Sequence, residues 1–166
     1  MQRVGIVTDS TADIPIELVA ELGIGIVPCH IAIDGQTYLD GVDLAADRFL
    51  SLLQERVIPT TGAPPVGIFV QTYRQMAASV DQIVSIHVAA GLSALHGTAV
   101  LATRSVPELD IRVVDSEQVS MGTGWLAVLA ARAARDGASV DEIMTLMDEA
   151  KPRIRVLAYI RDLEHL

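Results

Sequence analysis

Hydroxyl-bearing side chains are the residues in this sequence with the clearest potential for chemistry. Thr8–Thr11, Ala89–Ser93 and Asp115–Ser120 each follow an expected strand, and Thr61 lies in a glycine-flanked loop. Ser93 stands near an expected helix start, where free N–H groups and the helix dipole favour an anion. No Arg or Lys is adjacent to Thr61 or Ser93. Hydroxyls with backbone N–H groups therefore suit a singly charged carboxylate better than a polyphosphate.

The same residues also have purely structural interpretations. A serine at a helix N-terminus is commonly only a cap, and Thr60 and Thr61 could simply shape a turn. Asp9 and Asp115 could cap helices or hold loops in place. Composition and spacing alone predict an α/β domain with a polar crevice, and a structural or regulatory domain without a ligand stays open.

A serine hydrolase using Ser93 is an enzymatic alternative. The segment Gly91-Leu92-Ser93-Ala94-Leu95 follows an expected strand and opens a helix, as a nucleophile elbow does. Leu95, however, takes the place of the second glycine of that motif. His87 lies inside an expected strand, and His96 is one helical turn from Ser93, an unusual geometry for a base.

Neither a cofactor nor a metal is predicted. The phosphate-binding patterns G-x-x-x-x-G-K-[ST] and, after a strand, G-x-G-x-x-G are missing, and Gly122-Thr123-Gly124 lies in a helical context. Cys29 is the only cysteine, so it cannot form an internal disulfide or a structural zinc site. It follows Pro28 in an apolar run and is expected to be buried. The loop carboxylates match no known ligand spacing: Asp9, Asp13, Asp40 and Asp43.

The elements that must position these groups alternate between short apolar runs and longer amphipathic stretches. A hairpin is expected around Asp34-Gly35, and the Pro-, Gly- and Thr-rich segment 59–67 is expected to be a loop. Strands separated by helices predict a three-layer α/β/α, Rossmann-like domain with a mostly parallel sheet, whose ligand lies at the carboxyl ends of the strands. Expected strands are 4–7, 24–28, 82–88, 110–114 and 155–160, and expected helices are 13–23, 45–55, 66–78, 92–105, 120–135 and 140–150.

Size and composition narrow the functional classes. The 166 residues suit one domain, and 51% are hydrophobic, which is ample for a core. A net charge of −9 with one lysine, and only 4% aromatic residues, disfavour nucleic acid and anionic membranes as partners. The N-terminus has no long apolar segment, and Met121–Ala134 is too short to span a bilayer. A cytoplasmic protein without stable membrane insertion is expected.

The sequence resembles the DegV family. Val7–Pro15 is similar to the opening signature of that family, and Pro59–Pro64 resembles its threonine-bearing loop. Its two later loops have counterparts in the same order, so the similarity spans the whole chain. These and the remaining similar segments are Ala90–Ser93, Val114–Ser116 followed by Ser120–Gly124, Tyr38–Gly41 and Arg161–Leu166.

The resemblance implies a fatty acid carrier rather than an enzyme. Such a protein binds a long-chain fatty acid and presents it to a separate fatty acid kinase subunit, which phosphorylates the carboxylate for phospholipid synthesis. By this resemblance, Thr61 and Ser93 hydrogen-bond the carboxylate. The residues expected around the same crevice are Asp9, Ser10, Gly62, Ala94, Asp115 and Ser116.

This sequence departs from the family pattern in two respects. After the leucine of the second loop the family usually has Ser-Gly-Thr, whereas here Ser93 is followed by Ala94-Leu95. Thr61 is followed by Gly62-Ala63, where Ser-Gln is frequent in the family. The hydrogen-bond network around the carboxylate is therefore expected to be thinner. Residues 1–166 correspond to the family's N-terminal domain. Its C-terminal domain, which supplies much of the tail pocket and a histidine near the carboxylate, is expected to be absent from this chain, so the 166 residues should bind lipid weakly.

Overall fold

A four-stranded parallel sheet forms the centre of the computed structural model, which describes residues 3–55 and 58–159. The strand order is β2 (Gly25–Val27), β1 (Val4–Asp9), β6 (Gln82–His87) and β7 (Asp110–Asp115). All neighbouring strands in this sheet pair in parallel. The two central strands, β1 and β6, are buried over all but their first residue, as expected for strands covered on both faces.

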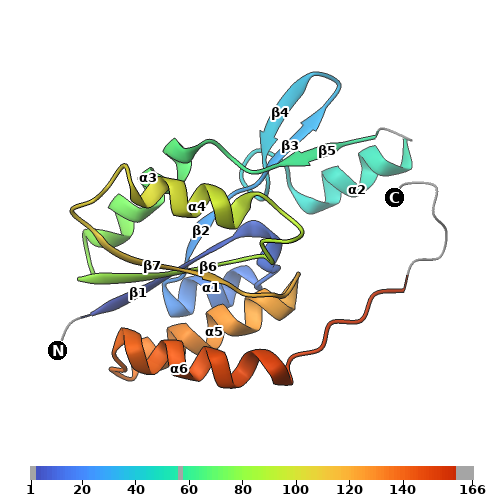
Figure 1. The fold of residues 1–166 in the computed structure, drawn as a ribbon. Helices are drawn as coiled ribbons and strands as arrows, with labels where there is room; N and C mark the ends of the chain where they lie inside the picture. Colours follow the sequence, from blue (N-terminus) through green and yellow to red (C-terminus); the bar gives the residue numbers. More distant parts are fainter. Residues whose placement is uncertain (1–2, 56–57, 160–166) are drawn as a thin grey trace.

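Helices cover both faces of this sheet (Figure 1). One layer contains α1 (Ile16–Leu22), α5 (Met121–Arg135) and α6 (Val140–Ala150), and the other contains α3 (Val66–Ala77) and α4 (Leu95–Thr103). Successive side chains of a strand point to opposite faces, so Ile6 packs in the core beneath α5 and α6, while Val7 packs in the core beneath α3 and α4. The predicted three-layer fold with a parallel sheet is confirmed.

A small antiparallel sheet extends beyond the three layers (Figure 1). Its order is β4 (Gln36–Leu39), β3 (His30–Ile33) and β5 (Thr60–Gly62), and α2 (Ala46–Gln54) contributes Phe49 and Leu52 to its core. The predicted hairpin is confirmed as β3 and β4. The prediction of a loop throughout 59–67 is wrong, because Thr60–Gly62 pairs with β3. This run of three residues follows Pro59 and ends in glycine, which is too short and too irregular to predict a strand, so the distant partner strand imposes this conformation.

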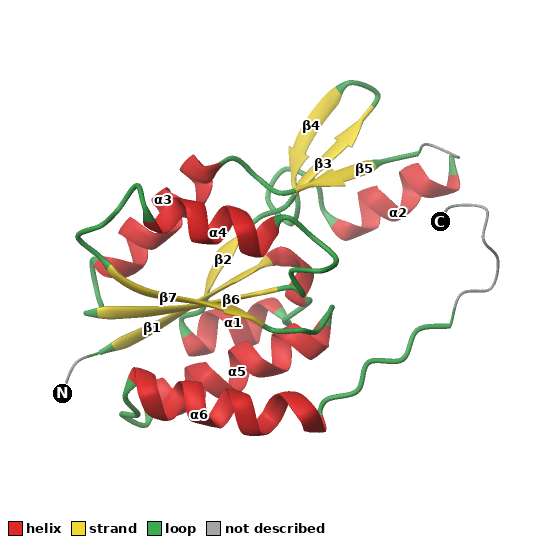
Figure 2. Cartoon of the chain, viewed as in Figure 1, coloured by secondary structure: helices red, strands yellow, loops and turns green. Residues whose placement is uncertain are grey.

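The predicted strand at 155–160 is not present over residues 155–159, which run as loop after the short 3-10 helix η2 (Lys151–Arg153) (Figure 2). The run is apolar, yet Leu157 is 95% exposed. A strand requires a neighbour to accept its backbone hydrogen bonds, and no pairing involves residues 155–159. Residue 160 and the family-like segment 161–166 lie outside the described residues.

The order of the parallel strands reverses between β1 and β6. From β1 the chain passes through α1 to β2 on one side, whereas from β6 it passes through α4 to β7 on the other side. Ligands in such folds bind at this reversal, outside the carboxyl ends of the strands. The segments that leave this edge are η1 (Ser10–Ala12) after β1 and residues 88–94 after β6.

The helices of residues 3–55 and 58–159 include none with both the length and the apolar character needed to cross a bilayer. The longest, α5, ends at Arg135 after 15 residues.

Thr8 offers a test of polar packing in the core. Its side chain is fully buried, and its hydroxyl has no hydrogen-bond partner among the described residues. Because an unsatisfied buried polar group costs about 1–3 kcal/mol, we expect Thr8→Val to raise the unfolding free energy by about 1 kcal/mol in urea titrations. The matched variant Thr123→Val removes a 2.9 Å hydroxyl pair with Ser116 and should lose stability. A loss in Thr8→Val as well would contradict the unpaired hydroxyl.

Candidate functional site

A pocket of about 350 Å³ lies at the carboxyl edge of the sheet, beside the strand-order reversal. It brings together Thr11 of η1, Thr61 and Gly62 of β5, and Ser93 and Ala94 of the segment after β6. The predicted residues Thr61, Gly62, Ser93 and Ala94 therefore share one pocket, although about thirty residues of chain separate the two pairs. Further lining residues are Cys29, Ile31, Asp40, Ala63, Leu92 and Leu95.

Pairing with β3 fixes Thr61 on the pocket wall. Thr61 is directly opposite Ile31, which also lines the pocket, and Gly62 is opposite His30. All three residues of β5 are exposed. The side chain of Thr61 is thus held by a strand and remains accessible to a ligand at the surface.

Ser93 combines a structural bond with an available hydroxyl hydrogen. Its oxygen accepts a hydrogen bond of 3.3 Å from the backbone N–H of Leu95, the first residue of α4. Its own N–H donates to the carbonyl of Ala89 at 3.2 Å, which fixes the turn. Ser93 therefore has a structural role at the start of α4, although Ala94 and not Ser93 is the N-cap of this helix. Among the described residues, no acceptor takes its hydroxyl hydrogen, so Ser93 can also donate to a ligand.

The pocket contains no basic side chain, as expected from the sequence around Thr61 and Ser93. Asp40 is the only charged side chain among its lining residues, and no Arg or Lys lines it. Cys29 is buried, as predicted. Burial raises the pKa of the Cys29 thiol to about 11, and the nearby carboxylates of Asp9 and Asp40 also raise it. The thiol is therefore neutral at physiological pH.

Four of the predicted crevice residues do not line this pocket, and each holds a loop instead. The Ser10 hydroxyl accepts the N–H of Cys29 at 3.0 Å. Asp115 accepts the N–H groups of Ala90 and Glu117 at 3.2 and 2.9 Å. Ser116 pairs with the Thr123 hydroxyl, and Asp9 belongs to a buried network. These bonds match the structural interpretation of Asp9 and Asp115.

The buried network links Asp9, His87, Ser85 and Tyr73. Asp9 Oδ2 is 2.9 Å from His87 Nδ1, His87 Nε2 is 2.7 Å from Ser85 Oγ, and Ser85 Oγ is 2.9 Å from the Tyr73 hydroxyl. Burial would raise the pKa of Asp9, but hydrogen bonds from His87, Thr11 and Val88 outweigh it and lower the pKa below 3.8. Sequence reasoning missed Ser85 and Tyr73. The polar alternation of Ser85 and His87 within an apolar strand was the available signal.

This network has the connectivity of a serine-protease triad without its accessibility. Ser85 is fully buried and its hydroxyl is bonded to Tyr73, so it cannot reach a substrate. The alternative nucleophile, Ser93, lies in a pocket lined by no histidine of the described residues. A nucleophilic serine requires an adjacent base. Neither serine therefore has the geometry of an activated nucleophile in this structure. Residues 3–55 and 58–159 also contain no cluster of three His, Cys, Asp or Glu side chains that could hold a metal ion.

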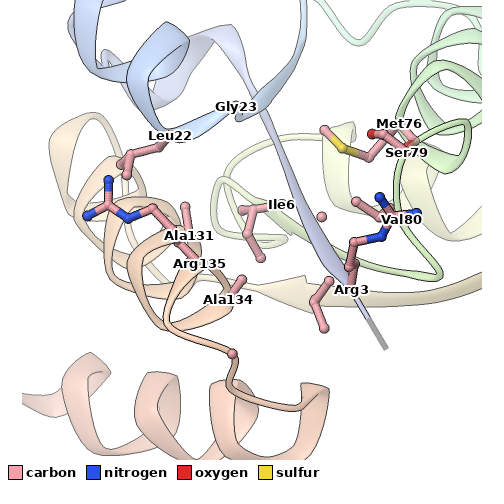
Figure 3. Close-up of a pocket in the computed structure, with 13 residues that line it drawn as sticks. Arg3, Ile6, Leu22, Gly23, Met76, Ser79, Val80, Ala131, Ala134 and Arg135 are labelled. Atoms are coloured by element: carbon pink, nitrogen blue, oxygen red, sulfur yellow. The ribbon is translucent and has the colours of Figure 1, made fainter. Parts of the chain in front are cut away.

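A second pocket, of about 470 Å³, lies at the opposite, amino-terminal edge of the sheet (Figure 3). Arg3 and Arg135 lie on opposite sides of it, with Ile6, Ala131 and Ala134 between them. The helices α1, α3 and α5 all end here, so their carbonyl ends weaken any attraction of an anion. Arg135 pairs with Glu21 at 3.2 Å, and the Ser79 hydroxyl donates to Met76 O. Although larger, this pocket is the weaker candidate.

Comparison with known proteins gives consistent matches over this chain. Residues 3–166 match the family model described as an uncharacterised protein of the DegV family. A DegV domain-containing protein of Caldanaerobacter subterraneus is 37% identical over 166 residues, which are all of this chain and 59% of that protein. Protein DegV of Bacillus subtilis is 32% identical over 99% of this chain and 59% of its own length. The chain thus spans less than two thirds of these relatives.

Solved structures of DegV family proteins also match this chain. The crystal structure of DegV from Bacillus subtilis, described as a fatty acid binding protein, has a TM-score of 0.86 and 30% identity, covering 92% of this chain and 55% of that one. A DegV family protein from Thermus thermophilus, whose structure describes fatty acid binding, has a TM-score of 0.82 and 28% identity, covering 90% and 54%. A stearic-acid-binding protein from Eubacterium ventriosum has a TM-score of 0.78 and 26% identity, covering 89% and 52%.

Proposed function

Because this chain belongs to the DegV family, we propose that it binds a long-chain fatty acid through its carboxylate and presents that acid to a separate kinase subunit. The observation that carries the proposal is the meeting of Thr61 and Ser93 in one pocket without a basic side chain. Fatty acid binding by solved relatives from Bacillus subtilis and Eubacterium ventriosum supports the ligand class.

The pocket suits a carboxylate with an alkyl chain. Hydrogen bonds to charged groups contribute about 1.5–3 kcal/mol each, so two hydroxyl donors can hold a carboxylate without an ion pair. Ile31, Ala63, Leu92 and Leu95 supply apolar surface beside them. The rest of a long alkyl chain would stay in water, and each methylene left there forfeits about 0.8 kcal/mol. The 166-residue chain alone should therefore bind weakly.

The presenting role agrees with the exposure of the site. A kinase must reach the carboxylate oxygen that it phosphorylates, and β5, which carries Thr61, is exposed. A buried head group would prevent such transfer. The kinase partner and a cytoplasmic location belong to this proposal, and the free, unpaired thiol of Cys29 is compatible with a reducing compartment.

Titration with palmitate labelled with ¹³C at its carboxyl carbon tests the binding, because NMR detects weak complexes. We expect the carboxyl resonance to shift, and Thr61→Val and Ser93→Ala each to weaken the affinity about tenfold, which corresponds to about 1.4 kcal/mol. Thr37→Val, an exposed threonine of β4, and Ser105→Ala, an exposed serine after α4, are matched controls that should bind as the wild type does. Equal affinity of all four variants would contradict the proposed site.

Cys29 provides an independent reporter of the pocket. Its raised pKa, about 11, predicts slow alkylation by iodoacetamide at neutral pH and a rate that rises about tenfold per pH unit, because the thiolate is the nucleophile. We expect palmitate to slow the reaction further, since the thiol lies on the pocket wall. Mass spectrometry reads this site without ambiguity because the chain has one cysteine. Alkylation as fast as in the denatured chain, or unaffected by palmitate, would count against the assignment.

A further inference from the structure

We propose that Asp9 and His87 are positioning residues, which hold the segments carrying Thr11 and Ser93 at the two sides of the pocket. The proposal rests on fatty acid binding at this pocket, and it concerns residues that do not line the pocket. It assigns a role to the buried network that carboxylate binding by Thr61 and Ser93 leaves unexplained.

Asp9 joins the ends of the two central strands. One carboxylate oxygen accepts the backbone N–H of Thr11 at 3.1 Å and also the Thr11 hydroxyl hydrogen. The other accepts His87 Nδ1–H at 2.9 Å and the backbone N–H of Val88 at 3.2 Å. These four donors come from η1 on one side and from the end of β6 on the other. Movement of either segment would leave part of a buried carboxylate unpaired, which is costly.

The hydrogen positions follow from the acceptors. Asp9 is an acceptor when ionised, so His87 carries a hydrogen on Nδ1. With a neutral imidazole, Nε2 then accepts the Ser85 hydroxyl, and Ser85 accepts the Tyr73 hydroxyl. Tyr73, Ser85 and His87 thus each donate a hydrogen bond to the next group of the network in the direction of Asp9. The ring of Phe69 packs edge-on against His87, with centroids 5.3 Å apart, and this contact fixes the imidazole plane.

Both anchored segments lead directly to the pocket. Thr11 lines the pocket and donates its hydroxyl hydrogen to Asp9, so this hydrogen bond fixes the orientation of the Thr11 side chain. Val88 is followed by Ala89, whose carbonyl accepts the N–H groups of Leu92 and Ser93 at 2.9 and 3.2 Å. The turn that holds Ser93 therefore begins at the residue directly after the anchor at Val88.

The two nitrogens of His87 allow a matched test. The amide nitrogen of an asparagine lies near the place of Nδ1, whereas the terminal amide of a glutamine reaches the place of Nε2, where its oxygen can accept the Ser85 hydroxyl. His87→Asn can therefore keep the donor to Asp9, and His87→Gln can keep only the bond toward Ser85. Tyr73→Phe removes the far end of the network and leaves every bond of Asp9 intact. His87→Gln and Tyr73→Phe retain side chains close in size to the original, whereas asparagine at position 87 is smaller and leaves some space in the core.

Affinity and the bound carboxyl resonance of ¹³C-labelled palmitate are measured for each variant, with folding checked by circular dichroism. We expect His87→Gln to bind about tenfold more weakly and to shift the bound resonance toward that of Ser93→Ala. We expect His87→Asn to recover most of the affinity. Tyr73→Phe should lose stability but keep the wild-type resonance, because it leaves every bond of Asp9 intact. If the network had a purely structural role, substitutions at its two ends would have equivalent effects on binding.

The outcomes separate this proposal from the function on which it rests. If the wild-type chain leaves the palmitate resonance unmoved, fatty acid binding and the positioning role both fail. If the wild type binds but His87→Gln binds equally well, or Tyr73→Phe weakens binding as much as His87→Gln does, only the positioning role fails. Should His87→Gln not fold, the relative affinities of Tyr73→Phe, His87→Asn and the wild type still test the positioning role. Weaker binding by Tyr73→Phe than by His87→Asn would overturn that role.

Discussion

Asp9→Ala is expected to lower the free energy of unfolding by about 3–5 kcal/mol, because several buried donors lose their acceptor and each unsatisfied buried polar group costs about 1–3 kcal/mol. The carboxylate is fully buried and accepts hydrogen bonds from Thr11, His87 and Val88. Alanine would leave these donors without an acceptor and without water. Because domains are stable by only about 5–15 kcal/mol, the variant should unfold at a much lower urea concentration.

Asp110→Ala is the matched control for this prediction. The Asp110 carboxylate also accepts a side-chain hydrogen bond, from Gln82 Nε2 at 2.5 Å, but Asp110 is exposed. Exposed pairs contribute about 0–1 kcal/mol, so its loss should be small. Urea titration of both variants gives the comparison. A cost in Asp9→Ala no larger than that in Asp110→Ala would mean that the network contributes little to stability.

The contribution of Asp9 should also depend on pH in a defined direction. Burial acts to raise the pKa of this carboxyl, but the hydrogen bonds from His87, Thr11 and Val88 outweigh it, and the folded value lies below the ordinary 3.8. A lowered folded pKa means that the stabilisation is complete above the unfolded pKa and is lost as the pH falls through the folded value. The stability difference between wild type and Asp9→Ala should therefore be constant near neutrality and shrink in acid. A difference that grows on acidification would contradict this sign.

The layers of the fold followed from the sequence because each element carries its own periodicity. The run Val4–Val7 is apolar without interruption, as is typical of a strand buried on both faces, and in 82–88 only Ser85 and His87 interrupt the apolar residues after Gln82. Thr60–Gly62 has no such pattern, and its strand exists only because β3 lies beside it. The run at 155–159 shows the reverse case, since its composition favours a strand but no neighbouring strand pairs with it.

The site could be predicted only in part, for a related reason. The carboxyl-edge rule predicted the edge at which this pocket lies, but the convergence of Thr61 with Ser93 was expected from family resemblance, since β5 joins the pocket through a long-range pairing. Cys29 and Asp40 reach the pocket from segments beside the small sheet and had no positional signal. Thr8 and Thr11 looked equivalent in sequence, yet Thr8 lies within the core and Thr11 on the pocket wall.

Gly124→Ala is expected to lower the unfolding free energy by about 2–3 kcal/mol, near the upper part of the range for overpacked cores. A Cβ at this position of α5 would lie 2.3 Å from the carbonyl oxygen of Ala12, 2.9 Å from Met121 Sδ and 3.0 Å from Ile14 Cγ1. The nearest of these atoms belongs to the backbone and cannot swing away. Relief requires α5 and η1 to separate.

This separation would reach the pocket, because η1 carries Thr11. Gly124→Ala should therefore weaken palmitate binding as well as stability, although Gly124 does not line the pocket. Gly97→Ala, in the exposed face of α4, is the control: apart from adjacent residues and the helix's own backbone, no atom lies within 4 Å of a Cβ placed there. Alanine there should raise stability by up to about 1 kcal/mol through helix propensity and leave binding unchanged. If both substitutions stabilise the protein, the close approach of α5 to η1 does not constrain this position. If Gly124→Ala destabilises but binds palmitate normally, the geometry of η1 does not set the head-group site.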